Sequence, residues 1–209
     1  MEPYITVKKT SEFVFEDRKS TFIGYATPVD NEKDALDFIA SVKKKYPDAR
    51  HWVYAYVLRE NSTMRYTDDR EPQGTAGMPV LDVIRKNGCT DTLIVVVRYF
   101  GGILLGTGGL VHAYTESASG ALKSATVIRY DIYNEISINL SYSDYQKIMS
   151  VFNDFDFHVV NTDYLEEVTI TGSILKEYCG EFVEKVTEVT SGRSVLNILS
   201  EKYDYRENN

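Results

Sequence analysis

The hydrophobic pattern of residues 1–60 changes from a two-residue repeat to a 3.6-residue repeat. Apolar side chains alternate between residues 13 and 25, on both sides of a polar turn at residues 17–20, which predicts a β-hairpin. A helical stripe follows Asn31, a residue suited to cap a helix, and Pro47 ends it. Residues 52–58 (WVYAYVL) are typical of a strand.

Residues 59–123 predict a loop, two helices and a buried strand between the helices. Residues 59–77 are polar and rich in turn formers, and Pro79 opens a short helix that stops at Asn87-Gly88. Residues 92–97 are mostly β-branched and predict a buried strand. A glycine-rich segment follows, and after it the apolar spacing predicts a helix from about Gly109 to Lys123.

The rest of the chain predicts the order strand, helix, strand, strand, helix, strand. The strands fall at residues 132–140, 157–162, 167–174 and 195–199, and Ser143 is placed to cap the first helix. This order is that of a ferredoxin-like split βαβ domain. Residues 127–131 predict a linker. We therefore expect two domains, 1–130 and 131–209, with a frayed tail at residues 201–209.

Charge is unevenly divided between these two parts. Residues 1–130 hold 17 Lys+Arg and 16 Asp+Glu, a net charge of +1, whereas residues 131–209 hold 6 and 15, a net charge of −9. The C-terminal part should therefore repel nucleic acid, while the N-terminal part can carry a local basic patch.

Composition predicts a cytoplasmic globular protein. The two cysteines, Cys89 and Cys179, form no disulfide framework and have no metal-ligand spacing. The N-terminus has no apolar signal segment, and the longest apolar run, residues 93–97, has the length of a strand. We expect no contact with a membrane.

Five of the 13 glycines fall within nine positions after the buried strand: Gly101, Gly102, Gly106, Gly108 and Gly109. A strand, a glycine loop and a helix N-terminus are the layout that an anion site requires. The Walker A and dinucleotide fingerprints both fail, because Leu110-Val111 occupy the positions that decide them. Two interpretations stay open: tight turns that pack the loop flat on a neighbour, or exposed main chain for phosphate, RNA or a protein.

The acidic group Asp68, Asp69 and Glu71 has a chemical and a structural interpretation. Three carboxylates could hold Mg²⁺ or transfer protons. They could also be turn residues, one of them capping the turn that follows. Arg70, which lies among them, weakens the metal interpretation because it would neutralise the site.

Other candidate groups give weaker signals. Arg98-Tyr99-Phe100 could contact phosphate and stack on a base, or could end a strand with its aromatic rings in the core. The three histidines are dispersed and, with two distant cysteines, predict no zinc site. A nucleophile elbow (GxSxG) is absent from the sequence.

Taken together, these residues resemble the signature of the YigZ/IMPACT family. The resemblance rests on Glu71-Pro72-x-Gly74-Thr75-Ala76-Gly77-x-Pro79, on VRYFGG at 97–102, on Leu105-Gly106-x-Gly108-Gly109-Leu110, and on Ala113-Tyr114. His51 with YAY at 54–56 is similar to the upstream element of the family. The chain departs from the family pattern at Arg70, Leu104 and His112, and the last two replace basic residues beside the glycine loop.

The resemblance implies an α+β protein with a ribosomal protein S5 domain 2-like domain followed by a ferredoxin-like domain. That pair is similar to domains four and five of elongation factor G. Eukaryotic relatives restrain a stress-responsive kinase of initiation factor 2, and some bacterial relatives carry a proline-dipeptidase label.

We therefore expect a non-catalytic regulatory protein that acts in translation or its stress regulation by contacting RNA, the ribosome or a translation-related protein. Arg98 would contact phosphate, Tyr99 would stack, and the glycines would let backbone N–H groups approach. The expected partner-binding residues are His51, Asp68, Asp69, Glu71, Gly74, Thr75, Gly77, Arg98, Tyr99, Gly101, Gly102, Gly106, Gly108 and Gly109. No cofactor or metal is expected. The alternatives are a peptidase-like hydrolase that uses His51, Asp68, Asp69 and Glu71, and an adaptor that contacts proteins only.

Overall fold

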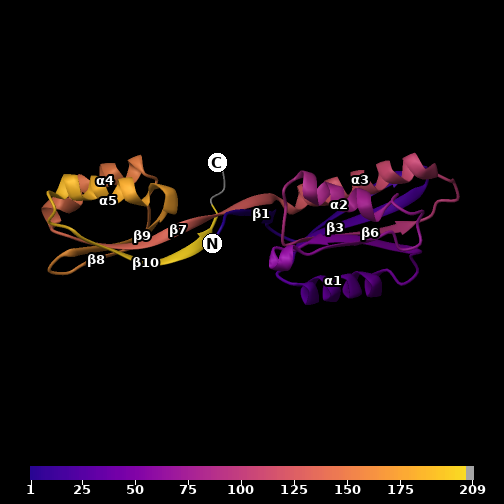
Figure 1. The fold of residues 1–209 in the computed structure, drawn as a ribbon, viewed down its shortest axis with the longest axis horizontal. Coiled ribbons are helices and arrows are strands. Elements are labelled where there is room, and N and C mark those ends of the chain that lie inside the picture. The colour runs from indigo at the N-terminus through magenta and orange to yellow at the C-terminus, as the bar shows by residue number, and fades with distance from the viewer. Residues whose placement is uncertain (206–209) are drawn as a thin grey trace. The chain divides into compact units, whose positions relative to one another are not determined.

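The computed structural model describes residues 1–205 and divides the chain into two compact units (Figure 1). One unit is Tyr4–Arg129, and the other joins Met1–Pro3 to the residues from Tyr130 onward. The first three residues belong with the C-terminal unit because the Glu2 backbone exchanges hydrogen bonds with the Tyr203 hydroxyl at 3.2 and 3.1 Å. The two units are described separately below.

The N-terminal unit is a five-stranded antiparallel sheet in the order β2-β3-β6-β4-β5. The strands are β2 (Ser11–Asp17), β3 (Ser20–Pro28), β4 (His51–Val57), β5 (Met64–Thr67) and β6 (Thr92–Tyr99). Helix α1 (Glu32–Lys45) covers one face, while α2 (Gly77–Lys86) and α3 (Gly106–Ala125) cover the other (Figure 1). A short strand β1 (Tyr4–Val7) and a 3-10 turn η1 (Glu60–Ser62) complete the unit.

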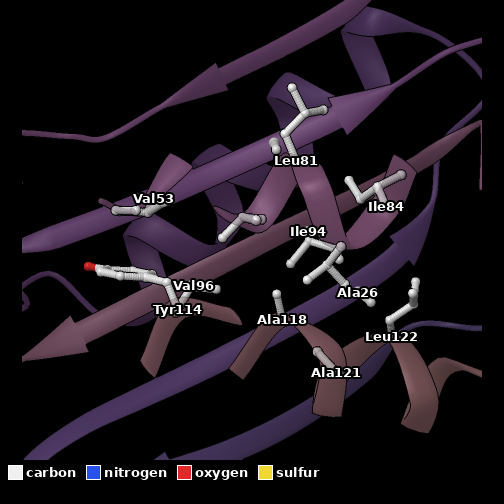
Figure 2. Packing of buried hydrophobic residues seen from close by; sticks show 14 of the residues in the cluster. Ala26, Val53, Leu81, Ile84, Ile94, Val96, Tyr114, Ala118, Ala121 and Leu122 are labelled. Atoms are coloured by element: carbon white, nitrogen blue, oxygen red, sulfur yellow. The ribbon is translucent and has the colours of Figure 1, made fainter. Parts of the chain in front are cut away.

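The central strand β6 is buried on both faces, and this explains its continuous apolar sequence. Ile94 and Val96 pack toward α2 and α3, where Figure 2 shows them among Leu81 and Ala118. Val95 and its neighbours at 93 and 97 pack in the cluster under α1. The sheet therefore separates two cores, and β6 contributes to both.

Of three local predictions for the N-terminal unit, one is confirmed and two differ from the structure. Asn31 caps α1 as expected, accepting the Asp34 N–H at 2.9 Å. Strand β5 lies inside the segment expected to be a loop, because pairing with β4 gives polar residues such as Arg65 a place at the sheet edge. Helix α3 begins at Gly106 rather than near Gly109, so three glycines of the cluster are helical.

The C-terminal unit has the order of elements that the sequence predicts. It consists of β7 (Val127–Leu140), α4 (Tyr142–Asp154), β8 (His158–Tyr164), β9 (Val168–Leu175), η2 (Lys176–Tyr178), α5 (Cys179–Thr190) and β10 (Val195–Asp204). The antiparallel strand order β10-β7-β9-β8 is the ferredoxin-like order. Ile136, Ile138 and Phe182 are fully buried between the sheet and its two helices.

Three expectations for this unit were wrong. The division between the two units falls within residues 127–131, but these residues form the start of the long strand β7 instead of an irregular linker. Ser141, not Ser143, caps α4, since its hydroxyl accepts the Asp144 N–H at 3.2 Å. Residues 201–204 of the expected frayed tail are paired with β7 as part of β10, for example Lys202 with Tyr133. Residues 206–209 of that tail lie outside the described residues. Among residues 1–205, no helix is both long and apolar enough to cross a membrane.

Gly24 on β3 provides a test of how tightly α3 packs on the sheet. A Cβ at this position would lie 2.6 Å from the Ser117 carbonyl oxygen of α3, and a backbone atom cannot move aside cheaply. Gly24→Ala should destabilise the N-terminal unit by about 1–3 kcal/mol. Urea unfolding followed by the fluorescence of Trp52, the single tryptophan, measures this loss.

Gly108→Ala is the matched control. Gly108 lies in the first turn of α3 with no heavy atom within 4 Å of the added Cβ and no positive φ. Alanine there should raise stability by about 0.5 kcal/mol because it restricts the unfolded chain. Equal losses in both variants would show that contact with Ser117 does not set the spacing of α3 from the sheet.

Asp144 makes the C-terminal unit sensitive to acid. Its buried carboxylate accepts two hydrogen bonds from Arg193, at 2.7 and 3.0 Å, and one from Lys147 at 3.2 Å. The Arg193 guanidinium holds the pKa of Asp144 well below its ordinary value. A lowered carboxyl pKa contributes stability that is complete above the ordinary Asp pKa, about 4, and is lost as the pH falls further. Asp144→Asn should therefore destabilise the unit at pH 7, and the difference from wild type should shrink below about pH 4.

Urea unfolding at several pH values, followed by the amide NMR signals of residues 142–154, checks this expectation. Arg193→Gln serves as the second variant, since removing the cation should weaken the pH dependence without changing the carboxylate. A difference between wild type and Asp144→Asn that stays constant from neutral pH into the acid range would contradict the assignment.

Candidate functional site

Four connecting segments meet at one end of the N-terminal sheet, where β3 begins and β6 ends. The strand register fixes this arrangement, since Thr21 pairs with Tyr99 and His51 pairs with Arg98. The segments are residues 17–20, 46–50, 68–76 and 100–105. We call this surface the glycine-loop end. All the expected site residues lie in the glycine-loop end or directly beside it.

Asp68 closes the segment between β5 and α2. One carboxylate oxygen accepts the N–H groups of Ala76 and Gly77 at 3.1 and 2.8 Å, and the other accepts the Gly74 N–H at 2.9 Å. These amides lead into the first turn of α2, whose N–H groups have no partner within the helix. Asp68 is therefore the cap of the following turn, one of the two roles left open by the sequence.

Asp69 and His51 join the same segment to the start of β4. Asp69 has φ +40°, its carboxylate accepts the Trp52 N–H at 2.7 Å, and its carbonyl oxygen lies 2.8 Å from His51 Nδ1. A carbonyl can only accept, so Nδ1 carries a proton. This contact turns His51 Nε2 toward the Glu71 carboxylate, 3.8 Å away.

Glu71 is the centre of a buried polar network. Its Oε1 atom accepts a hydrogen bond from Arg98 Nη1 at 2.5 Å and one from the Tyr114 hydroxyl at 2.8 Å. The side chains of Glu71 and Arg98 are 4% and 7% exposed, and Tyr114 is fully buried. Burial, reinforced by the Glu71 charge, raises the pKa of Tyr114 well above its ordinary value. The network ties the acidic segment to both β6 and α3.

The roles expected for Arg98 and Tyr99 need correction. Arg98 lies between Phe22 and Phe100 on the sheet face covered by α2 and α3, and its guanidinium donates to Glu71, so it is not presented to a phosphate. Tyr99 packs in the cluster under α1, and its hydroxyl donates to Asp48 at 2.8 Å. The interpretation of this segment as a strand end with packed aromatic residues holds for Tyr99. Phe100 remains 42% exposed.

The five clustered glycines divide between the two interpretations that the sequence left open. Gly101 packs flat on the hairpin turn, since a Cβ there would lie 2.0 Å from the Lys19 carbonyl group. Gly102 and Gly106 have φ of +85° and +71°, and Gly108 faces open space. Residues 102–108 are thus exposed, apart from Leu105, and at Gly102, Gly106 and Gly108 the exposed surface is main chain. Gly109 is half-buried, and a Cβ there would lie 3.1 Å from the Leu105 Cβ.

The remaining expected site residues shape the neighbouring turn. Gly74 is exposed with φ +77°, while Thr75 is buried and donates its hydroxyl to the Pro72 carbonyl at 2.7 Å. Gly77 is required by close approach, because a Cβ there would lie 2.5 Å from the Thr67 carbonyl oxygen. These residues hold the segment in place, and they offer little side chain to a binding partner.

The sequence analysis missed the exposed basic side chains around the glycine loop. Seven of them lie at or beside this end of the sheet: Arg18, Lys19, Lys43, Lys44, Lys45, Arg50 and Arg70. The run of three lysines in the last turn of α1 was the available signal, but only the fold shows that Lys45 reaches Glu12 and Tyr25 of the β2–β3 hairpin. The exposed carboxylates there are Glu12, which pairs with Lys45 at 3.0 Å, Glu16 and Asp48. Within residues 1–205, no group of three His, Cys, Asp or Glu side chains is placed to hold a metal ion.

Two family models match the chain in the order of its two units. The model described as the Impact N-terminal domain matches residues 18–122, which include His51, the Asp68 segment and the glycine loop. A domain of unknown function (DUF1949) matches residues 138–193. The chain belongs to the IMPACT family. The expected fold class, an S5 domain 2-like domain followed by a ferredoxin-like domain, is confirmed.

Relatives of this IMPACT-family chain are similar over nearly its whole length. "IMPACT family member YvyE" of Bacillus subtilis (strain 168) is 36% identical over 195 residues, which are 93% of this chain and 90% of that protein. "IMPACT family member YigZ" of Escherichia coli (strain K12) is 33% identical and covers 96% and 100%. A solved structure titled "Crystal structure of an hypothetical protein" has a TM-score of 0.60 and 32% identity, covering 96% of this chain and 98% of that one.

The Glu71–Arg98 pair gives a test of the network in this IMPACT-family chain. Glu71→Gln or Arg98→Met alone leaves one charge buried without its partner and should cost about 3–5 kcal/mol of stability. The double variant removes both charges and should cost clearly less than the two losses added together. Urea unfolding read by Trp52 fluorescence gives all three values, and additivity within about 0.5 kcal/mol would refute the coupling.

Proposed function

We propose that this IMPACT-family chain is a non-catalytic regulatory protein that acts in translation, or in its stress regulation, by binding ribosomal RNA through the glycine-loop end. One observation carries the proposal: at this end seven basic side chains are exposed, whereas Asp68, Asp69 and Glu71 are turned inward onto their own chain. A net charge of −8 conceals this arrangement.

The inward acidic groups are Asp68, Asp69 and Glu71. Each carboxylate accepts hydrogen bonds from its own unit, either from backbone N–H groups or from Arg98 and Tyr114. The cations that remain exposed, such as Lys44 and Arg50, are suited to phosphate contacts because each releases a condensed counterion from RNA. The surface is therefore more positive than the sequence of the segment suggests.

The exposed main chain at 102–108 adds a second contact to this surface. Helix α3 is long, begins at Gly106 and has no side chain capping its first turn, so its N–H groups face the same solvent. Leu104 at the tip of the loop is 82% exposed, and Ile103 beside it is 43% exposed. The minor groove of an RNA helix is shallow and lined by phosphates. It could receive the apolar tip at Ile103 and Leu104 while its phosphates contact the basic side chains.

The hydrolase alternative is less well supported by the geometry. Asp68 and Asp69 would have to release the amides that hold the segment before either carboxylate could act on a substrate. Glu71 would have to leave Arg98 and Tyr114. Arg98 in turn would lose its only hydrogen-bonded carboxylate among the described residues.

Salt dependence of ribosome binding tests the proposal. We expect the full chain to cosediment with ribosomal subunits, and its affinity to fall steeply as the salt concentration rises. Lys44→Ala with Arg50→Ala should weaken binding and reduce the slope of log K against log salt by roughly 1.5, since each lost phosphate contact removes about 0.7–0.9.

Lys33→Ala with Lys86→Ala is the matched control. Both lysines are exposed, and they lie at the opposite end of the N-terminal unit, so the net charge changes equally without touching the glycine-loop end. Equal effects of the two pairs would reject the assigned surface. Binding that does not respond to salt would favour a protein partner instead.

A further inference from the structure

The C-terminal unit exposes an apolar patch that the proposed function does not use. Tyr142, Met149, Tyr164 and Leu165 are 51%, 43%, 56% and 79% exposed, and half-buried Tyr145 lies among them. They come from one side of α4, at spacings of three and four residues, and from the last residue of β8 and the turn that follows it. We call these five residues the tyrosine patch.

Hydrogen bonds within the tyrosine patch fix its shape before any partner arrives. The Tyr142 hydroxyl donates to the Leu165 carbonyl at 2.8 Å, and the Tyr145 and Tyr164 hydroxyls are 2.9 Å apart. The Tyr145 and Tyr164 rings meet edge to face at 5.8 Å. The Leu165 N–H bonds to the Glu167 carbonyl at 3.1 Å, which holds the turn closed. A prearranged surface loses less conformational entropy when it binds.

The rim of the tyrosine patch is acidic. Asp163, Glu166 and Glu167 flank Tyr164 and Leu165 in the sequence and are all exposed. Lys147 of α4 is directed to Asp144, 3.2 Å away, at the buried side of the helix. The unit as a whole carries a net charge of −9 over residues 131–209. A partner for this patch must therefore bring apolar side chains bordered by positive charge.

Other surfaces of the unit lack this combination. The sheet carries small polar residues that share strand register, such as Ser137, Thr171 and Asn161, and its strongly exposed apolar residues, Val160, Val195, Ile198 and Leu199, are all aliphatic. The outer face of α5 is acidic, with Glu181, Glu184 and Glu188 exposed. Tyrosine, methionine and leucine together, at a surface that holds its own shape, are typical of an interaction site.

We propose that the tyrosine patch binds a basic amphipathic helix of a partner protein. The apolar side of that helix would cover Tyr142, Met149 and Leu165, and its lysines or arginines would lie against the acidic rim. The proposal goes beyond the proposed function, because it concerns a different unit and a protein rather than RNA.

A synthetic helix of leucine and lysine serves as the probe for the full chain. Fluorescence anisotropy should show binding, and amide NMR shifts should fall at residues 142–149 and 163–167. A peptide with serine in place of leucine keeps the charge, and a peptide with glutamate in place of lysine keeps the apolar face. Both should bind at least about ten-fold more weakly, because the serine peptide lacks the apolar face and the glutamate peptide lacks the positive charge.

Met149→Ser with Leu165→Ser should also weaken binding of the leucine–lysine helix at least about ten-fold. Val14→Ser is the matched control, since Val14 is 52% exposed but belongs to the N-terminal unit. If the double variant loses its fold, Leu165→Ser alone, in a turn, replaces it. Unchanged affinity in the patch variant, equal binding of the serine peptide, or shifts confined to α5 would overturn the proposal.

Discussion

The buried contact between Glu71 and Arg98 is the interaction on which the N-terminal unit depends. It joins the segment before α2 to the end of β6, and Tyr114 extends the same contact to α3. Two charges taken out of water stabilise a fold only when each has its partner in place. The network therefore forms only when the segment before α2, β6 and α3 are in one particular arrangement, and it does not stabilise other arrangements of them. With that arrangement set, the glycine loop between β6 and α3 has fixed ends.

The same inward orientation determines the character of the outer surface. Asp68 and Asp69 use their charge to bind amides of their own chain, so these acidic residues contribute little to the field at the glycine-loop end. Lys44, Arg50 and their basic neighbours remain exposed there. A chain with a net charge of −8 can in this way present a positive face. The acidic C-terminal unit, with its apolar patch, is suited to a partner of opposite character.

The sequence predicted elements whose signals are local. The Asn31 cap, the Phe13–Phe22 hairpin region and the six-element order of the C-terminal unit each follow from a pattern within a few residues. Prediction from the sequence failed for elements whose structure depends on pairing with a strand that is distant in the sequence. Strand β5 exists because β4 lies beside it, and residues 201–204 are ordered by β7, which is far away in the sequence. Among the site residues, the sequence predicts Arg98 as a phosphate ligand. The strand register, in which Arg98 pairs with Phe22, is needed to show that its side chain points into the core. The sequence does not show the exposed basic residues as one group, because they come from the β2–β3 turn, the end of α1, Arg50 and Arg70.

Amide hydrogen exchange of the full chain, with and without ribosomal subunits, tests the central claim most directly. The claim is that inward acidic groups hold a ready-made surface whose main chain is left open. The account predicts that the amides of Ala76 and Gly77 exchange slowly in the free chain, because Asp68 accepts them. The amides of Gly102, Thr107 and Gly108 should exchange quickly in the free chain and slow down when subunits are added. Fast exchange at Ala76 and Gly77, or loop amides unaffected by subunits that do bind the chain, would contradict it.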